Sequence, residues 1–237
     1  MRVEPFGDQA VRVILGDRIA PSVQKKIKQF TERFDRQPFA GFIEYVPAYT
    51  NVVLYYDPVV VIRHGRKDLP AQEQVCHYIQ ALLQDEEKEK GQEASRRRVR
   101  IPVCYGGDFG PDLVQVAACH NLTVKQVIAR HSAPSYLVYM LGFTPGFPFL
   151  GGLPEELATP RRKSPRLKIA AGSVGIAGQQ TGVYPLESPG GWQIIGRTPV
   201  ALFRPESNPP TLLMPGDIVT FEPITEAEFN RIRGQKS

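Results

Sequence analysis

The sequence contains few of the residues that build metal centres and disulfide frameworks. Three cysteines and four histidines occur among 237 residues. Cys76, Cys104 and Cys119 are scattered without a CxxC spacing, and the histidines form no HExxH motif. A zinc site needs clustered ligands of these types. We therefore expect no metal site, and we expect the free thiols of a protein from the reducing cytoplasm.

Long hydrophobic runs are also missing. No apolar run approaches the roughly 20 residues that span a bilayer, and the N-terminus lacks the pattern of a signal peptide. The phosphate-binding pattern GxxxxGK[ST] is absent as well. We expect a cytoplasmic protein that does not enter the membrane and binds no cofactor by itself.

The net charge of +5, from 29 basic and 24 acidic residues, raises the question of nucleic-acid binding. The first basic cluster, 96–100, follows the acidic run 85–87, and the two offset each other. The second cluster, 161–168, is interrupted by proline within a glycine-rich stretch. A small anion suits that cluster better than a nucleic-acid backbone, so we expect no nucleic-acid partner.

Residues 139–199 are dense in glycine and proline, yet bulky residues recur among them. Such a composition is typical of disordered linkers when large apolar residues are absent. Here Phe, Tyr, Leu, Ile and the single tryptophan, Trp192, separate the glycines and prolines. The stretch therefore predicts long ordered loops, which often carry a functional site.

The first part of the chain predicts a small α+β layer. Apolar alternation indicates a strand over 7–16 and further strands over 42–47 and 51–56. Apolar residues at helical spacing indicate a helix beginning near residue 21 and another over 70–89. Helices then cover one face of the sheet. The polar segment 85–98 is the best linker candidate, and we place the domains at 1–92 and 93–237.

The second part has a different pattern. A strand is predicted over 99–104 and two short helices over 113–120 and 123–131, the second capped by Thr123. From residue 136 onward, short apolar runs alternate with turns, as in a barrel or a sandwich. Residues 212–222 contain a Pro-Gly-Asp turn and predict a closing hairpin.

Several polar residues of this part could carry chemistry. Asp108 is a carboxylate suited to acid–base work, whereas we favour Asp112 as the cap of the helix that follows. Ser173 lies in no GxSxG motif, so a turn serine is favoured over a nucleophile. His120 and His131 lie near helix ends and could converge, although capping or packing is favoured for each.

Arg161, Arg162 and Arg166 lie close to Pro160 and Pro165, which restrict the backbone. An arginine held in this way can present a planar fork to a carboxylate or a phosphate. An exposed, solvated loop is the alternative interpretation.

Trp192 follows the turn 188–191 (SPGG). A tryptophan at such a position packs in the core or lines a pocket, and Gln179, Gln180 and Tyr184 could add polar groups to that wall.

Taken together, these motifs resemble the subunit 1 family of allophanate hydrolase, which includes the Kip inhibitor of a sporulation kinase and the B subunit of 5-oxoprolinase. The resemblance runs along nearly the whole chain. The matching segments are 7–8 (GD), 46–49 (VPAY), 56–58 (YDP), 105–108 (YGGD), 110–113 (GPDL), His131, 142–147 (GFTPGF), 160–161 (PR), 172–175 (GSVG) and 188–192 (SPGGW). It implies a small α+β N-terminal domain followed by a cyclophilin-like β-barrel.

The resemblance leaves three functions open. The favoured one is a subunit of an ATP-dependent 5-oxoprolinase, which opens 5-oxo-L-proline to L-glutamate with a subunit 2 homologue and a larger subunit that uses the ATP. The second is an inhibitor of a sensor histidine kinase, antagonised by the subunit 2 homologue. The third is the carboxyltransferase component of urea carboxylase.

We place the hypothetical site in the second domain. Asp108, His131 and Arg166 are the candidate catalytic residues: the two former for proton transfer, and Arg166 with Arg161 for holding a carboxylate or a phosphorylated intermediate. The candidate residues for binding substrate or partner are Arg161, Phe143, Phe147, Ser173, Gln180 and Trp192.

Overall fold

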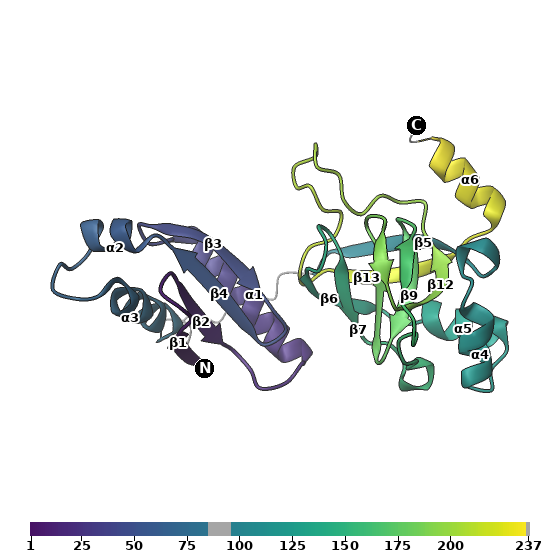
Figure 1. Cartoon of the computed structure of the whole chain (residues 1–237), viewed down its shortest axis with the longest axis horizontal. Coiled ribbons are helices and arrows are strands. Elements are labelled where there is room, and N and C mark those ends of the chain that lie inside the picture. The colour runs from purple at the N-terminus through teal and green to yellow at the C-terminus, as the bar shows by residue number, and fades with distance from the viewer. Residues whose placement is uncertain (85–95, 236–237) are drawn as a thin grey trace. The chain divides into compact units, whose positions relative to one another are not determined.

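The computed structural model describes residues 1–84 and 96–235, and the chain divides into two compact units, Met1–Ser95 and Arg96–Ser237. Each unit has its own hydrophobic core. Unit 1 combines a sheet with helices, and unit 2 contains a closed barrel (Figure 1). The prediction of an α+β chain with a barrel in its second half is confirmed. The sequence placed the boundary at 92/93.

Over its described residues, 1–84, unit 1 is an antiparallel four-stranded sheet in the order β1-β2-β4-β3 with three helices. Its strands are β1 (Arg2–Pro5), β2 (Ala10–Ile14), β3 (Phe42–Pro47) and β4 (Asn51–Tyr56); its helices are α1 (Pro21–Arg36), α2 (Pro58–His64) and α3 (Ala71–Gln84). Alternate residues of β2 and β4, such as Val13 and Leu54, are buried against apolar residues of α1 and α3, such as Phe34 and Ile79. One face of the sheet therefore forms this core.

Two elements of unit 1 were missed in the sequence. β1 is four residues long, too short for its alternation to indicate a strand, so its pairing with β2 decides its structure. α2 begins with a side-chain cap, because Asp57 accepts hydrogen bonds from Val59 N and Val60 N. The helix predicted over 70–89 is α3, and residues 85–95 of the predicted linker lie outside the described residues.

Unit 2 is a closed barrel in the order β10-β7-β6-β13-β5-β12-β9. Its strands are β5 (Arg98–Tyr105), β6 (Tyr136–Leu141), β7 (Pro148–Gly151), β9 (Ser173–Ala177), β10 (Gln180–Val183), β12 (Gln193–Arg197) and β13 (Ile218–Pro223). A separate two-stranded ribbon joins β8 (Arg166–Ile169) and β11 (Ser188–Gly190). Alternate strand residues such as Ile101, Val174 and Phe221 are buried in one core, because side chains alternate across a strand.

Three helices and two short 3-10 turns complete unit 2: α4 (Leu113–Cys119), α5 (Val124–Ser132), α6 (Glu226–Gly234), η2 (Gly107–Phe109) and η3 (Glu155–Leu157). α4 and α5 pack on each other and contact β12 and β13, respectively (Figure 1). The predicted cap of α5 is confirmed: Thr123 and Gln126 form a reciprocal capping box.

The predicted hairpin over 212–222 is wrong. Residues 212–214 form no strand, and β13 pairs in parallel with β5 and antiparallel with β6. The Pro-Gly-Asp turn is held instead by Asp217, which accepts hydrogen bonds from Met214 N and the Arg97 guanidinium. The turn was therefore predicted correctly, but the strands that pair with β13 lie far from it in the sequence.

Within residues 1–84 and 96–235, no helix combines the length and apolar character needed to cross a membrane.

Candidate functional site

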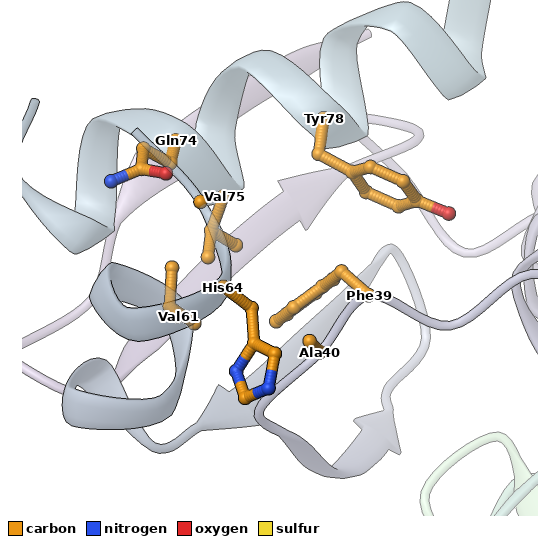
Figure 2. Close-up of a pocket in the computed structure, with 8 residues that line it drawn as sticks. Phe39, Ala40, Val61, His64, Gln74, Val75 and Tyr78 are labelled. Carbon is orange, nitrogen blue, oxygen red and sulfur yellow. The ribbon is translucent and has the colours of Figure 1, made fainter. Parts of the chain in front are cut away.

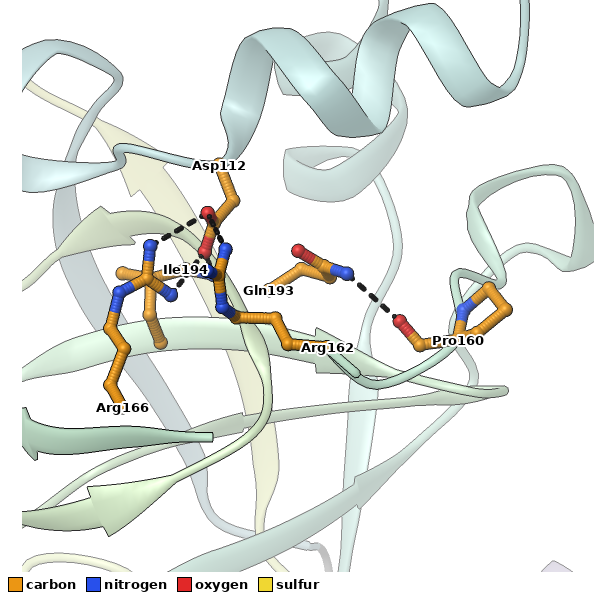
Figure 3. Close-up of polar contacts among 6 residues, drawn as sticks. All are labelled: Asp112, Pro160, Arg162, Arg166, Gln193 and Ile194. Carbon is orange, nitrogen blue, oxygen red and sulfur yellow. Dashed lines mark hydrogen bonds and ion pairs between the residues drawn. The ribbon is translucent and has the colours of Figure 1, made fainter. Parts of the chain in front are cut away.

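A buried carboxylate, Asp112, gathers two arginines at the entrance to α4. Arg166 donates to it from both terminal nitrogens, Nη1 at 2.7 Å and Nη2 at 2.8 Å, and Arg162 Nη1 donates at 2.9 Å. The backbone N–H of Ile194 supplies a fourth hydrogen bond at 2.7 Å. Figure 3 shows both guanidinium groups turned toward this carboxylate. We call Asp112, Arg162 and Arg166 the arginine cluster.

Backbone contacts hold the cluster in place. Asp112 N donates to Ile194 O at 2.9 Å, which ties the start of α4 to β12. On the other side, Arg162 N donates to Gly191 O at 2.7 Å, and the side-chain amide of Gln193 donates to Pro160 O at 3.0 Å. The proline-restricted loop therefore lies along the segment that enters β12 (Figure 3), and Arg162 is held through both its backbone and its side chain.

The charges of the cluster do not cancel, since two guanidinium groups share one carboxylate. Burial acts to raise the pKa of Asp112, but hydrogen bonds from Arg166 and from Ile194 N–H outweigh it, so the pKa lies below its usual value. The hydrogen bond to Asp112 raises the pKa of Arg166. Two guanidinium groups against one carboxylate leave one positive charge unbalanced within the cluster.

The role expected for Asp112 is corrected by this geometry. Asp112 stands at the N-cap position of α4, but its side chain makes no capping hydrogen bond. Its side chain is 4% exposed, and a buried carboxylate is stabilised best by charged donors. The arginines therefore take the oxygen atoms that a cap would have used.

The arginines differ in how many donors remain open. Arg166 spends both terminal nitrogens on Asp112. Arg162 spends one, and its Nε is buried without a hydrogen-bond partner among the described residues, as is Oε1 of the neighbouring Gln193. Arg166 therefore has no terminal nitrogen left for a ligand, whereas Arg161 is exposed and Arg162 is half-buried with one terminal nitrogen on Asp112. The sequence signal for Arg162 was its place next to Arg161, between Pro160 and Pro165.

Aromatic residues pack in a second cluster outside the main barrel core. Trp192 lies 5.5 Å from Phe147 and 6.3 Å from Tyr184 between ring centroids. Phe143 meets Phe147 edge-on at 5.6 Å but is 67% exposed, with φ at 66°. A positive φ is uncommon for a bulky residue. Trp192 directly precedes Gln193 and Ile194, which donate hydrogen bonds to Pro160 and Asp112, respectively. The aromatic cluster is therefore joined in sequence to the surroundings of the arginine cluster.

His131 lies inside the barrel rather than with the arginines. Thr181 Oγ1 donates to Gly175 O, so it accepts from His131 Nε2 at 2.9 Å. Nδ1 is then the acceptor for the Tyr105 hydroxyl at 2.8 Å. Burial lowers the pKa of His131 to about 3. His120 contacts Thr159 instead, so the two histidines have different partners.

The remaining predicted residues are spread over unit 2. Asp108 is exposed on η2. Ser173 is buried at the start of β9, and Gln180 is half-buried at the start of β10. Among the residues that the structure describes, no group of three or more His, Cys, Asp or Glu is placed to hold a metal ion.

Comparison with known proteins identifies the family. A family model described as the carboxyltransferase domain, subdomain C and D, matches residues 1–213. Over 237 residues the chain is 46% identical to the B subunit of 5-oxoprolinase from Bacillus subtilis, covering 100% of this chain and 98% of that protein. It is 43% identical over 221 residues to the Escherichia coli O157:H7 protein of the same name, covering 93% and 95%.

Among solved structures, TTHA0988 superimposes with a TM-score of 0.77 at 35% identity. The match covers 91% of this chain but 40% of that one, so this chain spans less than half of the solved protein. The chain belongs to the carboxyltransferase domain, subdomain C and D, family and resembles the B subunit of 5-oxoprolinase over its whole length.

Proposed function

We propose that this chain is the B subunit of a multi-subunit, ATP-dependent 5-oxoprolinase, which converts 5-oxo-L-proline to L-glutamate in the cytoplasm. The observation that carries the proposal is the 46% identity to the Bacillus subtilis subunit along the full length of the chain. The partners in this proposal are a subunit 2 homologue and a larger subunit. The larger subunit would hold ATP, since the sequence here contains no GxxxxGK[ST] motif.

The arginine cluster is the proposed contact for an anion, either the substrate carboxylate or a phosphorylated intermediate. Its support is the unbalanced positive charge of two guanidinium groups on one carboxylate, together with the exposed guanidinium of the neighbouring Arg161. Arg166 acts through Asp112: by holding that carboxylate from both terminal nitrogens, it keeps the start of α4 against β12. Fixed donors of this kind stabilise developing negative charge at little cost in reorganisation.

Proton transfer is proposed for Asp108 rather than for His131. Asp108 is exposed and can reach a ligand. His131 is fully buried, and both its ring nitrogens are used inside the barrel. We therefore assign His131 a structural role. Phe143, which is exposed beside Phe147, extends the apolar wall toward solvent.

The test is steady-state kinetics of the reconstituted complex with Arg161→Ala and Arg162→Ala. Each loses a charged hydrogen bond to the anion, so we expect the KM for 5-oxoproline to rise about 10-fold or more. Lys168→Ala is the matched control, because Lys168 is exposed on β8 and pairs with Glu187 at the surface. A pull-down on each variant separates assembly from binding. Unchanged KM in both arginine variants, with assembly intact, would remove Arg161 and the arginine cluster from the substrate site.

A further inference from the structure

Unit 1 contains a cavity of about 180 Å³ between α2, α3 and the segment that follows α1. It is lined by Phe39, Ala40, Val61, His64, Gly65, Gln74, Val75 and Tyr78. Figure 2 shows Val61 and Val75 facing the space between α2 and α3, with Phe39 beside them and the His64 ring next to Ala40. The cavity lies in the unit that does not contain the arginine cluster.

The walls of the cavity suit a flat apolar group. Phe39 and Tyr78 meet edge-on with their ring centroids 5.5 Å apart, and Val61 and Val75 are buried at 6% and 1% exposure. Aromatic rings bind well against such edges and methyl groups. Ala40, His64 and Gly65 are exposed, so the space is a pocket that opens to solvent, and its volume is large enough for one aromatic ring with a small substituent.

The polar groups of the lining are nearly all engaged. Gln74 Oε1 accepts from Arg66 N, and Gln74 Nε2 donates to Arg66 O and Leu69 O. The Tyr78 hydroxyl donates to Gln37 O. His64 is different: its Nδ1 lies 3.0 Å from Val60 O and so carries the proton. In the neutral ring Nε2 is the acceptor; no described residue donates to it, and because His64 is exposed, a ligand there would replace water.

The charged residues near the pocket favour a small ligand over a protein partner. Arg63, Arg66 and Lys67 around the α2–α3 turn are all exposed. The cores of protein interfaces are depleted in charged residues and need a broad apolar area. A pocket of this size beside a turn of exposed charged residues suits a small molecule better than the broad apolar area of a protein interface.

We propose that this cavity binds a small neutral aromatic compound that carries a hydroxyl or ring N–H, of the phenol or indole class. The ring lies against Phe39, Val75 and Tyr78, and its O–H or N–H donates to His64 Nε2. The site is separate from the proposed enzymatic role and does not depend on it.

The test is an NMR titration of the full chain with phenol and, separately, with benzene. Phenol should give saturable shifts at the Val61 and Val75 methyls, while the Trp192 indole in unit 2 stays unmoved. Benzene lacks the donor, so its affinity should be about fivefold lower, as expected for one lost hydrogen bond.

Two variants and one control sharpen the result. Ala40→Leu fills the space from an exposed position and should abolish the shifts. His64→Ala should lower phenol affinity to that of benzene, whereas His77→Ala on the exposed side of α3 should change nothing. The proposal is overturned if phenol gives no saturable shift, if Ala40→Leu binds phenol unchanged, or if phenol and benzene bind equally. Tighter binding of a blocked tyrosine amide than of phenol would overturn it in favour of a partner's side chain.

Discussion

Lowering the pH should destabilise unit 2 through His131. In the neutral state every polar atom of the ring is satisfied: Nε2 donates to Thr181, and Nδ1 accepts from Tyr105. Protonation would put a charge in the barrel interior, where the ring is 0% exposed. It would also turn Nδ1 into a donor, so the Tyr105 hydroxyl proton would lose its acceptor. Folding therefore favours the neutral ring.

The magnitude follows from the two pKa values. The folded pKa is about 3, against an ordinary value of 6.5. Because the folded pKa is depressed, the unfolded chain binds the proton first as the pH falls below 6.5. The stability that the neutral His131 contributes is fully present above pH 6.5 and is lost progressively as the pH falls toward 3. Between pH 7 and pH 5 the loss is about 2 kcal/mol, at about 1.4 kcal/mol per pH unit.

Trp192 makes the measurement specific to unit 2, because it is the single tryptophan and is buried there. Urea denaturation followed by its fluorescence at pH 7 and pH 5 gives the two free energies of unfolding. His131→Gln keeps a donor and an acceptor but removes the titration, so the wild type should lose about 2 kcal/mol more than the variant. Equal pH dependence would refute the reasoning. If the variant does not fold, NMR titration of the wild type decides the question, because a His131 ring that protonates near pH 6 would refute it equally.

Three further predictions concern the site and its support. Asp112→Asn should lower the free energy of unfolding of unit 2 by about 2 kcal/mol, because both guanidinium groups lose their charged partner. The loss stays moderate because both arginines are partly exposed and water can solvate them; a urea midpoint equal to that of wild type would contradict this. Gly110→Ala should cost about 2–3 kcal/mol, since a Cβ would stand 2.0 Å from Ile195 O; an unshifted melting temperature would show that this contact relaxes freely. Thr123→Ala should cost about 1 kcal/mol by removing the cap of α5, and the reasoning fails if the same denaturation assay finds no loss.

Local sequence patterns predicted the elements that are built from local contacts. The alternation in β2 and the helical spacing of Val23, Ile27 and Phe34 in α1 were enough to place these elements, because the same residues form the core of unit 1. The capping box of α5 was readable for the same reason, since its partners lie three residues apart.

The site itself depends on contacts between distant residues. Asp112 resembled a helix cap because it directly precedes a predicted helix. Its partners, Arg162 and Arg166, lie 50 and 54 residues later in the chain. His131 likewise meets Tyr105 and Thr181 from 26 and 50 residues away. Closure of the barrel creates these pairs, and no local pattern records which strands will be neighbours. The pairing of β13 with β5 in place of the predicted hairpin has the same origin.

The most direct test of the proposed function is 5-oxoproline-dependent ATP hydrolysis and glutamate release by the purified cognate subunits, with and without this chain. We predict that both activities require it. Equal activity in its absence would contradict the assignment of the chain as an obligate subunit of the enzyme.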